Sequence, residues 1–288
     1  MRPIVEDRCS QHFLAIDQHA MGEADSDGSK LSGPVAFSWV ELVTSDSAAA
    51  TPFYEEVFGW TAVDSTTSGG TYVLLQQDHA DVAGLYEMGD KQREGNIRPH
   101  WLPYVSVPSV DEALVRAGDL GASLINPPTD IGAGRMSVIE DPTGAVLAFW
   151  EAKEHPGTGL LGEPGSLTWM EHLSPRPDAA ISFYTTLFNW TAESSGSSAH
   201  MHSSLRGEVG DVAGVVQSDE RERARWRVYF SVEETQSTRD RIERNGGVIE
   251  AEAERPNGLA AHATDPQGAS FGILQAGSER KDQETVRA

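Results

Sequence analysis

One segment near the start of the chain recurs 130 residues later without a gap. Residues 37–63, FSWVELVTSDSAAATPFYEEVFGWTAV, align with residues 167–193, LTWMEHLSPRPDAAISFYTTLFNWTAE. The aligned segments share a Trp-x-Glu pattern, a Phe-Tyr pair and a Trp-Thr-Ala run. A duplication of this kind constrains the fold strongly, because both copies are expected to adopt the same structure.

The match continues through the rest of each copy, with small loop deletions. Three later motifs align at shifts of 130, 125 and 124 residues. They are DVAG at residues 81 and 211, WLPYVSV and WRVYFSV at residues 101 and 226, and DPTG and DPQG at residues 141 and 265.

The duplication divides the chain into two domains, and 288 residues are enough for each domain to bury its own core. A segment rich in Gly and Pro joins the copies, and polar segments flank them. The predicted parts are a flexible leader at 1–33, a first domain at 34–150, a linker at 151–165, a second domain at 166–276 and a tail at 277–288.

Each copy opens with the pattern of a strand followed by a helix. Residues 39–44 alternate between two faces, and residues 47–58 have apolar side chains at helical spacing, with Asp46 placed to cap the helix. Three β-prone runs broken by turns follow, and the second half of the copy repeats this order between Tyr104 and Trp150. The pattern predicts an α+β fold of four βαβββ modules.

Composition excludes several classes of partner. The net charge is −22, which disfavours nucleic acid and anionic membranes because phosphate binding requires Lys and Arg. No apolar run approaches the roughly 20 residues of a membrane span. The start lacks the features of a signal peptide, and the single Cys9 cannot form an internal disulfide. We therefore expect a cytoplasmic protein, monomer or homodimer, whose partner is a small organic molecule.

The strand, helix, FY-x3-FGW motif and D-P-x-G turn together resemble the vicinal oxygen chelate superfamily, which includes glyoxalases, bleomycin resistance proteins and extradiol dioxygenases. The resemblance covers residues 34–276 and is greatest for tandem-domain, glyoxalase-like proteins, some of them called hydroxylases. It implies that two modules pair into a cup-shaped antiparallel sheet. It also implies a ligand inside the cup, where enzymes of the superfamily hold a divalent metal ion with His and Glu side chains.

The positions that match the metal ligands of the superfamily hold other residue types here. Counted from the motifs, they are Trp39, Leu102 and Ala148 in the first copy, and Trp169, Arg227 and Gly272 in the second. Metal ions are bound by His, Cys, Asp and Glu side chains, so the sequence predicts no metal and no other cofactor. A residual alternative is a ligand pair formed by His200 and His202.

The first strands carry the residues that we expect to act on a ligand. Trp39 and Glu41 share one face of a strand, and Trp169 and Glu171 share the matching face in the second copy. A ring next to a carboxyl group could form the floor of a pocket for a flat molecule, with the two glutamates as catalytic groups. The alternative is that these side chains only pack or hydrogen-bond inside the fold.

Alternation on the other central strands adds further candidates for ligand binding. Tyr104 belongs to the first cup, and Arg227 and Tyr229 belong to the second. Arg227 could pair with a ligand carboxylate or with Glu171, which would make the cups chemically different. His262 is expected at a strand end or in a loop, where it could line a rim or be a structural or solvated residue. His172 is expected on the helix-facing side of its strand. Asp141 and Asp265 are interpreted as turn residues.

Three functions fit this sequence. The first is a metal-independent binding protein or enzyme of the glyoxalase-like superfamily. It would act on an aromatic or polyketide-like metabolite in bacterial secondary metabolism, resistance or detoxification, and any catalysis would be acid–base chemistry of a lyase, isomerase or hydroxylase-like kind. The second is a metal-dependent lyase or dioxygenase. The third is a non-catalytic sequestering or regulatory module.

Overall fold

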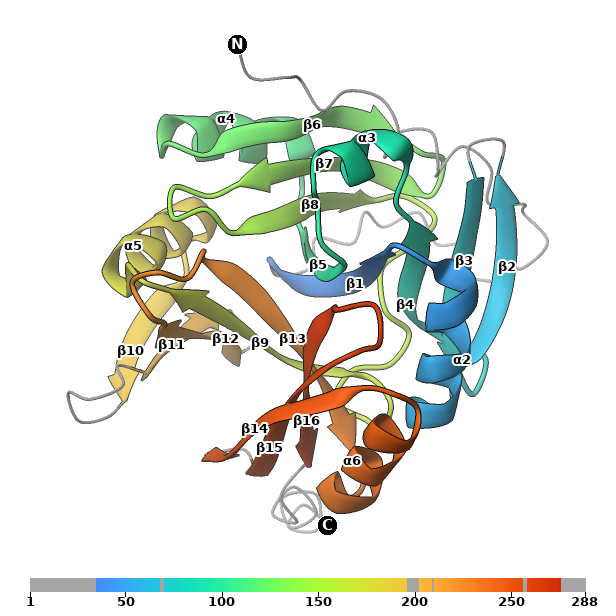
Figure 1. Ribbon diagram of the computed structural model, residues 1–288. Helices are drawn as coiled ribbons and strands as arrows, with labels where there is room; N and C mark the ends of the chain where they lie inside the picture. Colours follow the sequence, from blue (N-terminus) through green and yellow to red (C-terminus); the bar gives the residue numbers. More distant parts are fainter. Residues whose placement is uncertain (1–34, 68–69, 196–201, 209, 256–257, 276–288) are drawn as a thin grey trace, which may run out of the picture.

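The two copies fold into two eight-stranded sheets with few helices, as the repeated pattern predicts (Figure 1). The structure is a computed structural model that describes residues 35–67, 70–195, 202–208, 210–255 and 258–275. The first copy contains β1 (Ala36–Thr44), α2 (Ser47–Phe58), β2 (Thr61–Thr67), β3 (Gly70–Gln77), β4 (Ala80–Glu87), α3 (Asp90–Glu94), β5 (His100–Ser106), α4 (Val110–Asp119), β6 (Ser123–Asp130), β7 (Gly134–Glu140) and β8 (Val146–Ala152). The second contains β9 (Leu167–Ser174), α5 (Pro177–Phe188), β10 (Thr191–Ser195), β11 (His202–Gly207), β12 (Gly210–Gln217), β13 (Arg225–Val232), α6 (Thr235–Arg244), β14 (Val248–Arg255), β15 (Gly258–Thr264) and β16 (Ser270–Gln275).

Local signals account for the ends of the first helix in each copy. The Asp46 side chain accepts a hydrogen bond from the Ala49 amide, and Gly59 ends α2 in the left-handed conformation at φ 76°. In the second copy Pro177 opens α5 and Asn189 takes the left-handed position at its end. Within the described ranges, every helix is too short or too polar to cross a membrane.

The order of strands shows how the modules pair. The first sheet runs β2-β3-β4-β1-β5-β8-β7-β6, and the second runs β10-β11-β12-β9-β13-β16-β15-β14. The first strands of the two modules in a copy, β1 and β5, are antiparallel neighbours, and β9 and β13 repeat this arrangement. Modules therefore pair in chain order within each copy, a question that the sequence left open.

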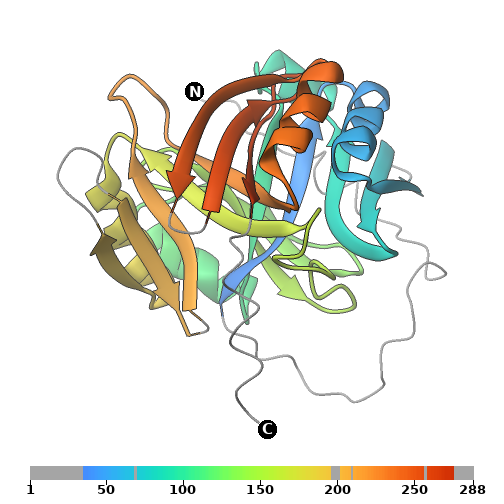
Figure 2. The ribbon, with the colours of Figure 1, turned by 90° about the horizontal axis from the view of Figure 1, so that it is seen from below.

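The two faces of each sheet have different surroundings. On β1, Val40 and Leu42 belong to a large buried cluster, whereas Trp39 and Val43 belong to a second cluster on the opposite face. The large cluster contains residues of both copies, because the helix-bearing faces pack against each other. Figure 2 shows α2 of the first copy beside α6 of the second, and the contacts between these helices agree. The opposite faces form the two cups.

Reciprocal hydrogen bonds join the copies across the shared core. The Tyr54 hydroxyl on α2 donates to Asp265 Oδ2 at 2.9 Å, and the Tyr184 hydroxyl on α5 donates to Asp141 Oδ2 at 2.7 Å. The Trp101 indole donates to the Tyr54 hydroxyl at 3.1 Å, and the second copy repeats this contact. Each aspartate thus accepts a hydrogen bond from a helix of the other copy as well as from the backbone of its own turn.

Asp141 combines the predicted turn with a buried cluster that the sequence did not show. Its Oδ1 accepts from the amides of Thr143, Gly144 and Ala145, which is the turn. Its Oδ2 lies 2.9 Å from His172 Nε2 of the other copy, and both side chains are buried. Burial by itself raises the pKa of Asp141, but its hydrogen bonds, first that of His172, lower the pKa to about 2. His172 lies on the helix-facing side of its strand, as predicted.

The segment that follows β8 packs against the first sheet. The Thr158 amide donates to Ser38 O and the Gly159 amide donates to Asp81 O, both at 2.7 Å. Gly157 has φ 123°, and a Cβ atom at this position would lie 2.4 Å from Ser38 O. The chain can follow this path only with glycine at position 157. We call residues 153–160 the strap.

Candidate functional site

Trp39, Glu41 and Tyr104 meet in the first cup. β1 places Trp39 and Glu41 on the concave face, and Trp39 is the register partner of Tyr104 on β5. The Tyr104 hydroxyl donates to Glu41 Oε2 at 2.5 Å, and both side chains are fully buried. Glu41 Oε1 is buried without a hydrogen-bond partner among the described atoms. The alternation of side chains thus brings together the three residues that the sequence singled out.

The environment of Glu41 favours the neutral carboxyl group. Burial raises the pKa of Glu41 to about 8, and the Tyr104 hydrogen bond lowers it only in part. The register partner of Glu41 on β5 is Leu102, which offers no charge to offset the burial. At neutral pH most of this carboxyl group is protonated, so it can donate a proton.

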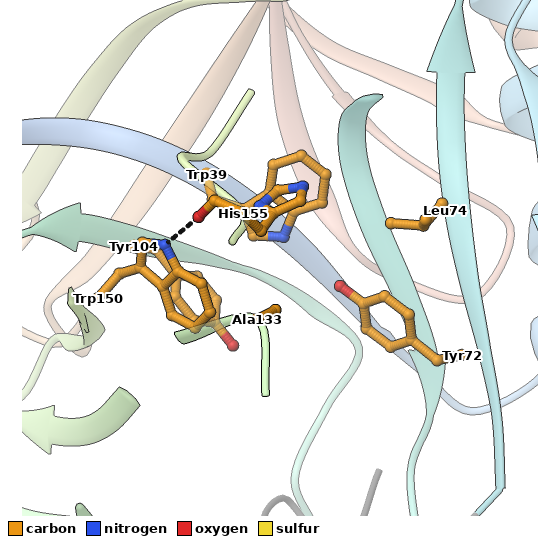
Figure 3. Close-up of a pocket in the computed structure, with 7 residues that line it drawn as sticks. All are labelled: Trp39, Tyr72, Leu74, Tyr104, Ala133, Trp150 and His155. Carbon is orange, nitrogen blue, oxygen red and sulfur yellow. Dashed lines mark hydrogen bonds between the residues drawn. The ribbon is translucent and has the colours of Figure 1, made fainter. Parts of the chain in front are cut away.

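Aromatic side chains fill the rest of the first cup (Figure 3). The remaining cavity has a volume of about 20 Å³, roughly the room of one water molecule. Its lining consists of Trp39, Tyr72, Leu74, Tyr104, Ala133, Trp150 and His155. Tyr72 fits because Gly84 has no side chain, since a Cβ atom there would lie 2.0 Å from the tyrosine oxygen.

His155 of the strap covers this cavity. Its ring meets the Trp39 ring edge-on, with centroids 4.9 Å apart. The Trp150 indole donates to the His155 backbone oxygen at 2.9 Å, the bond drawn in Figure 3. His155 Nε2 also lies 3.5 Å from Asp81 Oδ2. The first cup is thus closed by the linker between the copies, a role that the sequence did not predict for that segment.

The second cup repeats the central arrangement of the first. The Tyr229 hydroxyl on β13 donates to Glu171 Oε2 at 2.6 Å, and Trp169 on β9 is the register partner of Tyr229. Glu171 and Tyr229 are buried, whereas Trp169 is half-buried. The predicted candidates Trp169, Glu171 and Tyr229 therefore lie together, in a cup separate from that of Glu41.

The second cup contains two basic side chains next to its glutamate. Arg227 Nη1 lies 4.0 Å from Glu171 Oε2, and 3.0 Å and 3.2 Å from the ring nitrogens of His262. His262 Nε2 lies 2.9 Å from the Tyr229 hydroxyl. The pairing of Arg227 with Glu171, one of the two alternatives from the sequence, is present in this structure.

The expectation that His262 lies at a strand end or in a loop was wrong. β15 begins at Gly258, so His262 lies in the middle of a strand, opposite Gly272 of β16 and beside Tyr229. The repeat held a usable signal, because the shift of 124 residues at the D-P-x-G turn aligns His262 with Val138, an inward residue of the first cup.

The described residues of the cups do not fit a metal ion of the superfamily kind. At the described positions no group of three or more His, Cys, Asp or Glu side chains is close enough to hold one. A Cβ atom on Gly272 would lie 2.2 Å from the Tyr229 ring, so Tyr229 occupies the space of a ligand side chain at that position. Glu171 and His262 are near each other, but the cation of Arg227 lies beside both. His200 and the side chain of His202 lie outside the described residues.

Fold and site together define a tandem protein with two cups of paired βαβββ modules. Family profiles agree: residues 36–149 match the Glyoxalase/Bleomycin resistance protein/Dioxygenase superfamily, and residues 170–274 match a glyoxalase-like domain. The chain belongs to this superfamily, also called the vicinal oxygen chelate superfamily.

Two relatives cover most of the chain. CFP32 of Mycobacterium tuberculosis (strain CDC 1551 / Oshkosh), a candidate glyoxylase by its name, is 34% identical over 255 residues, which are 83% of this chain and 94% of the relative. The anthracycline biosynthesis protein DnrV of Streptomyces peucetius is 31% identical over 267 residues, with coverage of 84% and 94%.

Solved structures show the same fold at low sequence identity. The Mn(II)-bound glyoxalase of Novosphingobium aromaticivorans superposes with a TM-score of 0.60 at 15% identity, covering 83% of this chain and 81% of that chain. The 2,3-dioxygenase LapB of Pseudomonas sp. KL28 has a TM-score of 0.58 at 15% identity, with coverage of 85% and 93%.

Proposed function

We propose that this protein binds a flat aromatic or polyketide-like metabolite in a cup and acts on it by acid–base chemistry without a bound metal ion. The process would belong to bacterial secondary metabolism, resistance or detoxification. One observation carries the proposal: both cups hold a buried Glu–Tyr pair, and the positions of the metal ligands hold aromatic, aliphatic, glycine and arginine residues.

The two glutamates lie in separate cups, so each would act on a ligand in its own cup. Glu41, mostly neutral at pH 7, can donate a proton. Glu171, whose Oε2 lies 4.0 Å from Arg227 Nη1, would be the proton acceptor of the second cup. Tyr229 can donate a hydrogen bond to oxygen as negative charge develops. In the second cup a proton shift beside a carbonyl group, as in an isomerase, would have Glu171 take the proton from one carbon and return it to a neighbouring carbon.

The relatives support the class of ligand. DnrV and its counterpart DauV of Streptomyces sp. (strain C5) are named for anthracycline biosynthesis. An aromatic metabolite of that class has flat rings that can stack on Trp169 and carbonyl or hydroxyl groups that a Glu–Tyr pair can bind. A cytoplasmic location, a monomer or homodimer and a lack of nucleic-acid partners remain predictions from the sequence.

The test compares Glu→Gln variants on a panel of aromatic polyketide ketones. Turnover is followed by chromatography with mass detection, and by deuterium uptake from D2O at carbons beside carbonyl groups. Glu171→Gln keeps the shape and removes the base, so we expect a loss of turnover of about 100-fold or more, with ligand affinity changed much less. Glu41→Gln reports on the first cup in the same assay.

Three outcomes separate the alternatives. Turnover by the native protein that survives prolonged chelation by EDTA and fails in Glu171→Gln supports the proposal. Turnover that EDTA abolishes and a divalent ion restores indicates metal-dependent chemistry and contradicts it. Tight binding of a panel compound with no turnover, unchanged by either variant, indicates a sequestering protein and contradicts the catalytic part.

A further inference from the structure

Arg227 brings a permanent positive charge into the second cup. Across β9 and β13 it is the register partner of Glu171, and in the first cup Leu102 is the register partner of Glu41 in the same way. A guanidinium stays charged at all physiological pH values, and its burial is unfavourable unless its donors find acceptors. The Arg227 side chain is only 6% exposed. Its position therefore calls for acceptors inside the cup.

The described acceptors around Arg227 do not satisfy this charge. The carboxylate of Glu171 lies 4.0 Å from Nη1, which is beyond hydrogen-bond distance. Arg227 Nε is buried without a hydrogen-bond partner among the described atoms. A guanidinium has five N–H donors in a planar fork that matches a carboxylate. An anionic group of a ligand would supply the missing acceptors.

The neighbouring hydrogen bonds direct the Glu171 carboxylate toward Tyr229. One assignment of donors has Arg227 Nη1 donate to His262 Nδ1, His262 Nε2 donate to the Tyr229 hydroxyl, and that hydroxyl donate to Glu171 Oε2. The 3.2 Å contact of Arg227 Nη1 with His262 Nε2 is then not a hydrogen bond. In this arrangement His262 is neutral. The chain of bonds occupies Nη1 and leaves other donors of the guanidinium for a ligand.

An aromatic wall lies beside this charge. Trp169 and Glu171 are two residues apart on the same face of β9, so Trp169 and Arg227 are diagonal neighbours in the cup. Trp169 is half-buried, whereas its counterpart Trp39 is 5% exposed beneath His155. The second cup thus presents a partly exposed ring next to an incompletely satisfied guanidinium.

We propose that the second cup is a binding site for a flat aromatic acid, with the ring stacked on Trp169 and the carboxylate on Arg227. This inference rests on the proposed function and names the class of ligand and the cup that binds it. The net charge of −22 repels an anion at long range, so specific binding of an aryl carboxylate requires a cation inside the site.

The experiment compares 2-naphthoate with 2-naphthamide, which share a ring system and differ in charge. Binding to the full chain is measured by calorimetry and by quenching of tryptophan fluorescence. We expect naphthoate to bind about 10- to 100-fold more tightly than naphthamide, the range for hydrogen bonds to a charged group. Arg227→Leu, which copies Leu102, should remove this preference, and Arg227→Lys should keep part of it.

Arg225→Leu is the matched control. It removes a cation from the same strand, where Arg225 pairs with the exposed Glu222, so it should leave both affinities unchanged. His262→Val, which copies Val138, should weaken naphthoate binding less than Arg227→Leu. If Arg227→Leu fails to fold, the affinities of the two probes for the native protein and for Arg227→Lys still test whether Arg227 binds the carboxylate.

Three results would overturn the inference: equal affinity for both probes, no binding of either at millimolar concentration, or equal effects of Arg225→Leu and Arg227→Leu. Equal affinity for naphthoate and naphthamide, together with loss of turnover in Glu171→Gln, would contradict the anionic ligand and leave the acid–base function supported. Preference for naphthoate together with full turnover in Glu171→Gln would support the anionic ligand and contradict the acid–base function.

Discussion

The Glu41 carboxyl group couples the stability of the first cup to pH. Its pKa is about 8 in the folded protein and near 4.5 when exposed, so the folded state holds its proton more tightly. A group of this kind stabilises the fold fully below pH 4.5, and its contribution is lost as pH rises through 8. Glu41→Gln should remove this loss, on the order of 4 kcal/mol between pH 5 and pH 9.

Urea unfolding at several pH values measures the effect. The native protein should lose stability between pH 5 and pH 9 relative to Glu41→Gln, and the variant should be the more stable of the two at pH 9. If the free energy of unfolding depends on pH in the same way for the two proteins, the pKa of Glu41 is not raised by folding, which would contradict the account.

At this scale the sequence predicted which residues of the candidate site share a strand face, because alternation along a strand depends only on the backbone. It placed Trp39 with Glu41 and Trp169 with Glu171 on common faces, and the structure agrees. It could not show the Tyr104 to Glu41 hydrogen bond, which depends on the register between two strands. It also could not show which side chains would fill a cup, so the closure of the first cup by His155 was missed.

The strap depends on a single glycine. Gly157 has φ 123°, and a Cβ atom added at this position would lie 2.4 Å from Ser38 O. Gly157→Ala would therefore push the strap away from β1. We expect a loss of roughly 1–3 kcal/mol in stability and easier quenching of Trp39 fluorescence by acrylamide. Gly132→Ala is the control, because Gly132 also has positive φ, 72°, but has nothing within 4 Å of its Cβ position. Equal losses in the two variants would contradict a role for the contact with Ser38.

The first helix of each copy is anchored to the other copy through a tyrosine. Tyr54→Phe leaves the buried Asp265 without its 2.9 Å donor, and Tyr184→Phe does the same to Asp141. Each change should lower the free energy of unfolding by about 1–3 kcal/mol. Thr185→Val on the outer side of α5 should cost much less, since its hydroxyl bonds only within the helix. Chemical denaturation measures all three, and a Tyr→Phe cost no larger than that of Thr185→Val would contradict the anchor.

Helices and strands were predictable from periodicity, but their partners were not. Tyr54 and Phe58 follow helical spacing, which assigns them to a core but does not show that residues of the other copy belong to the same core. The D-P-x-G turns were predicted from Asp and Pro alone, whereas the contact of Asp141 with His172 and Tyr184 requires the other copy to be in place. Pairing of modules within a copy likewise depends on packing that local patterns do not contain.

At the scale of the whole molecule, the two copies share one core. The large apolar cluster includes Leu42 and Phe149 of the first copy together with Phe230 and Phe271 of the second. We therefore expect one cooperative unfolding transition, with coincident midpoints by circular dichroism and by tryptophan fluorescence. Two separated transitions would show that the copies are independent domains.

The central claim is the proposal that this member of the superfamily works through Glu–Tyr pairs, in cups whose described residues include no set of metal ligands. The metal content of the purified native protein tests it most directly, after expression in medium supplied with manganese, iron, nickel and zinc and with no chelator during purification. Elemental analysis by plasma mass spectrometry should find each of these metals far below one ion per chain. One divalent ion per cup that survives dialysis would contradict the account.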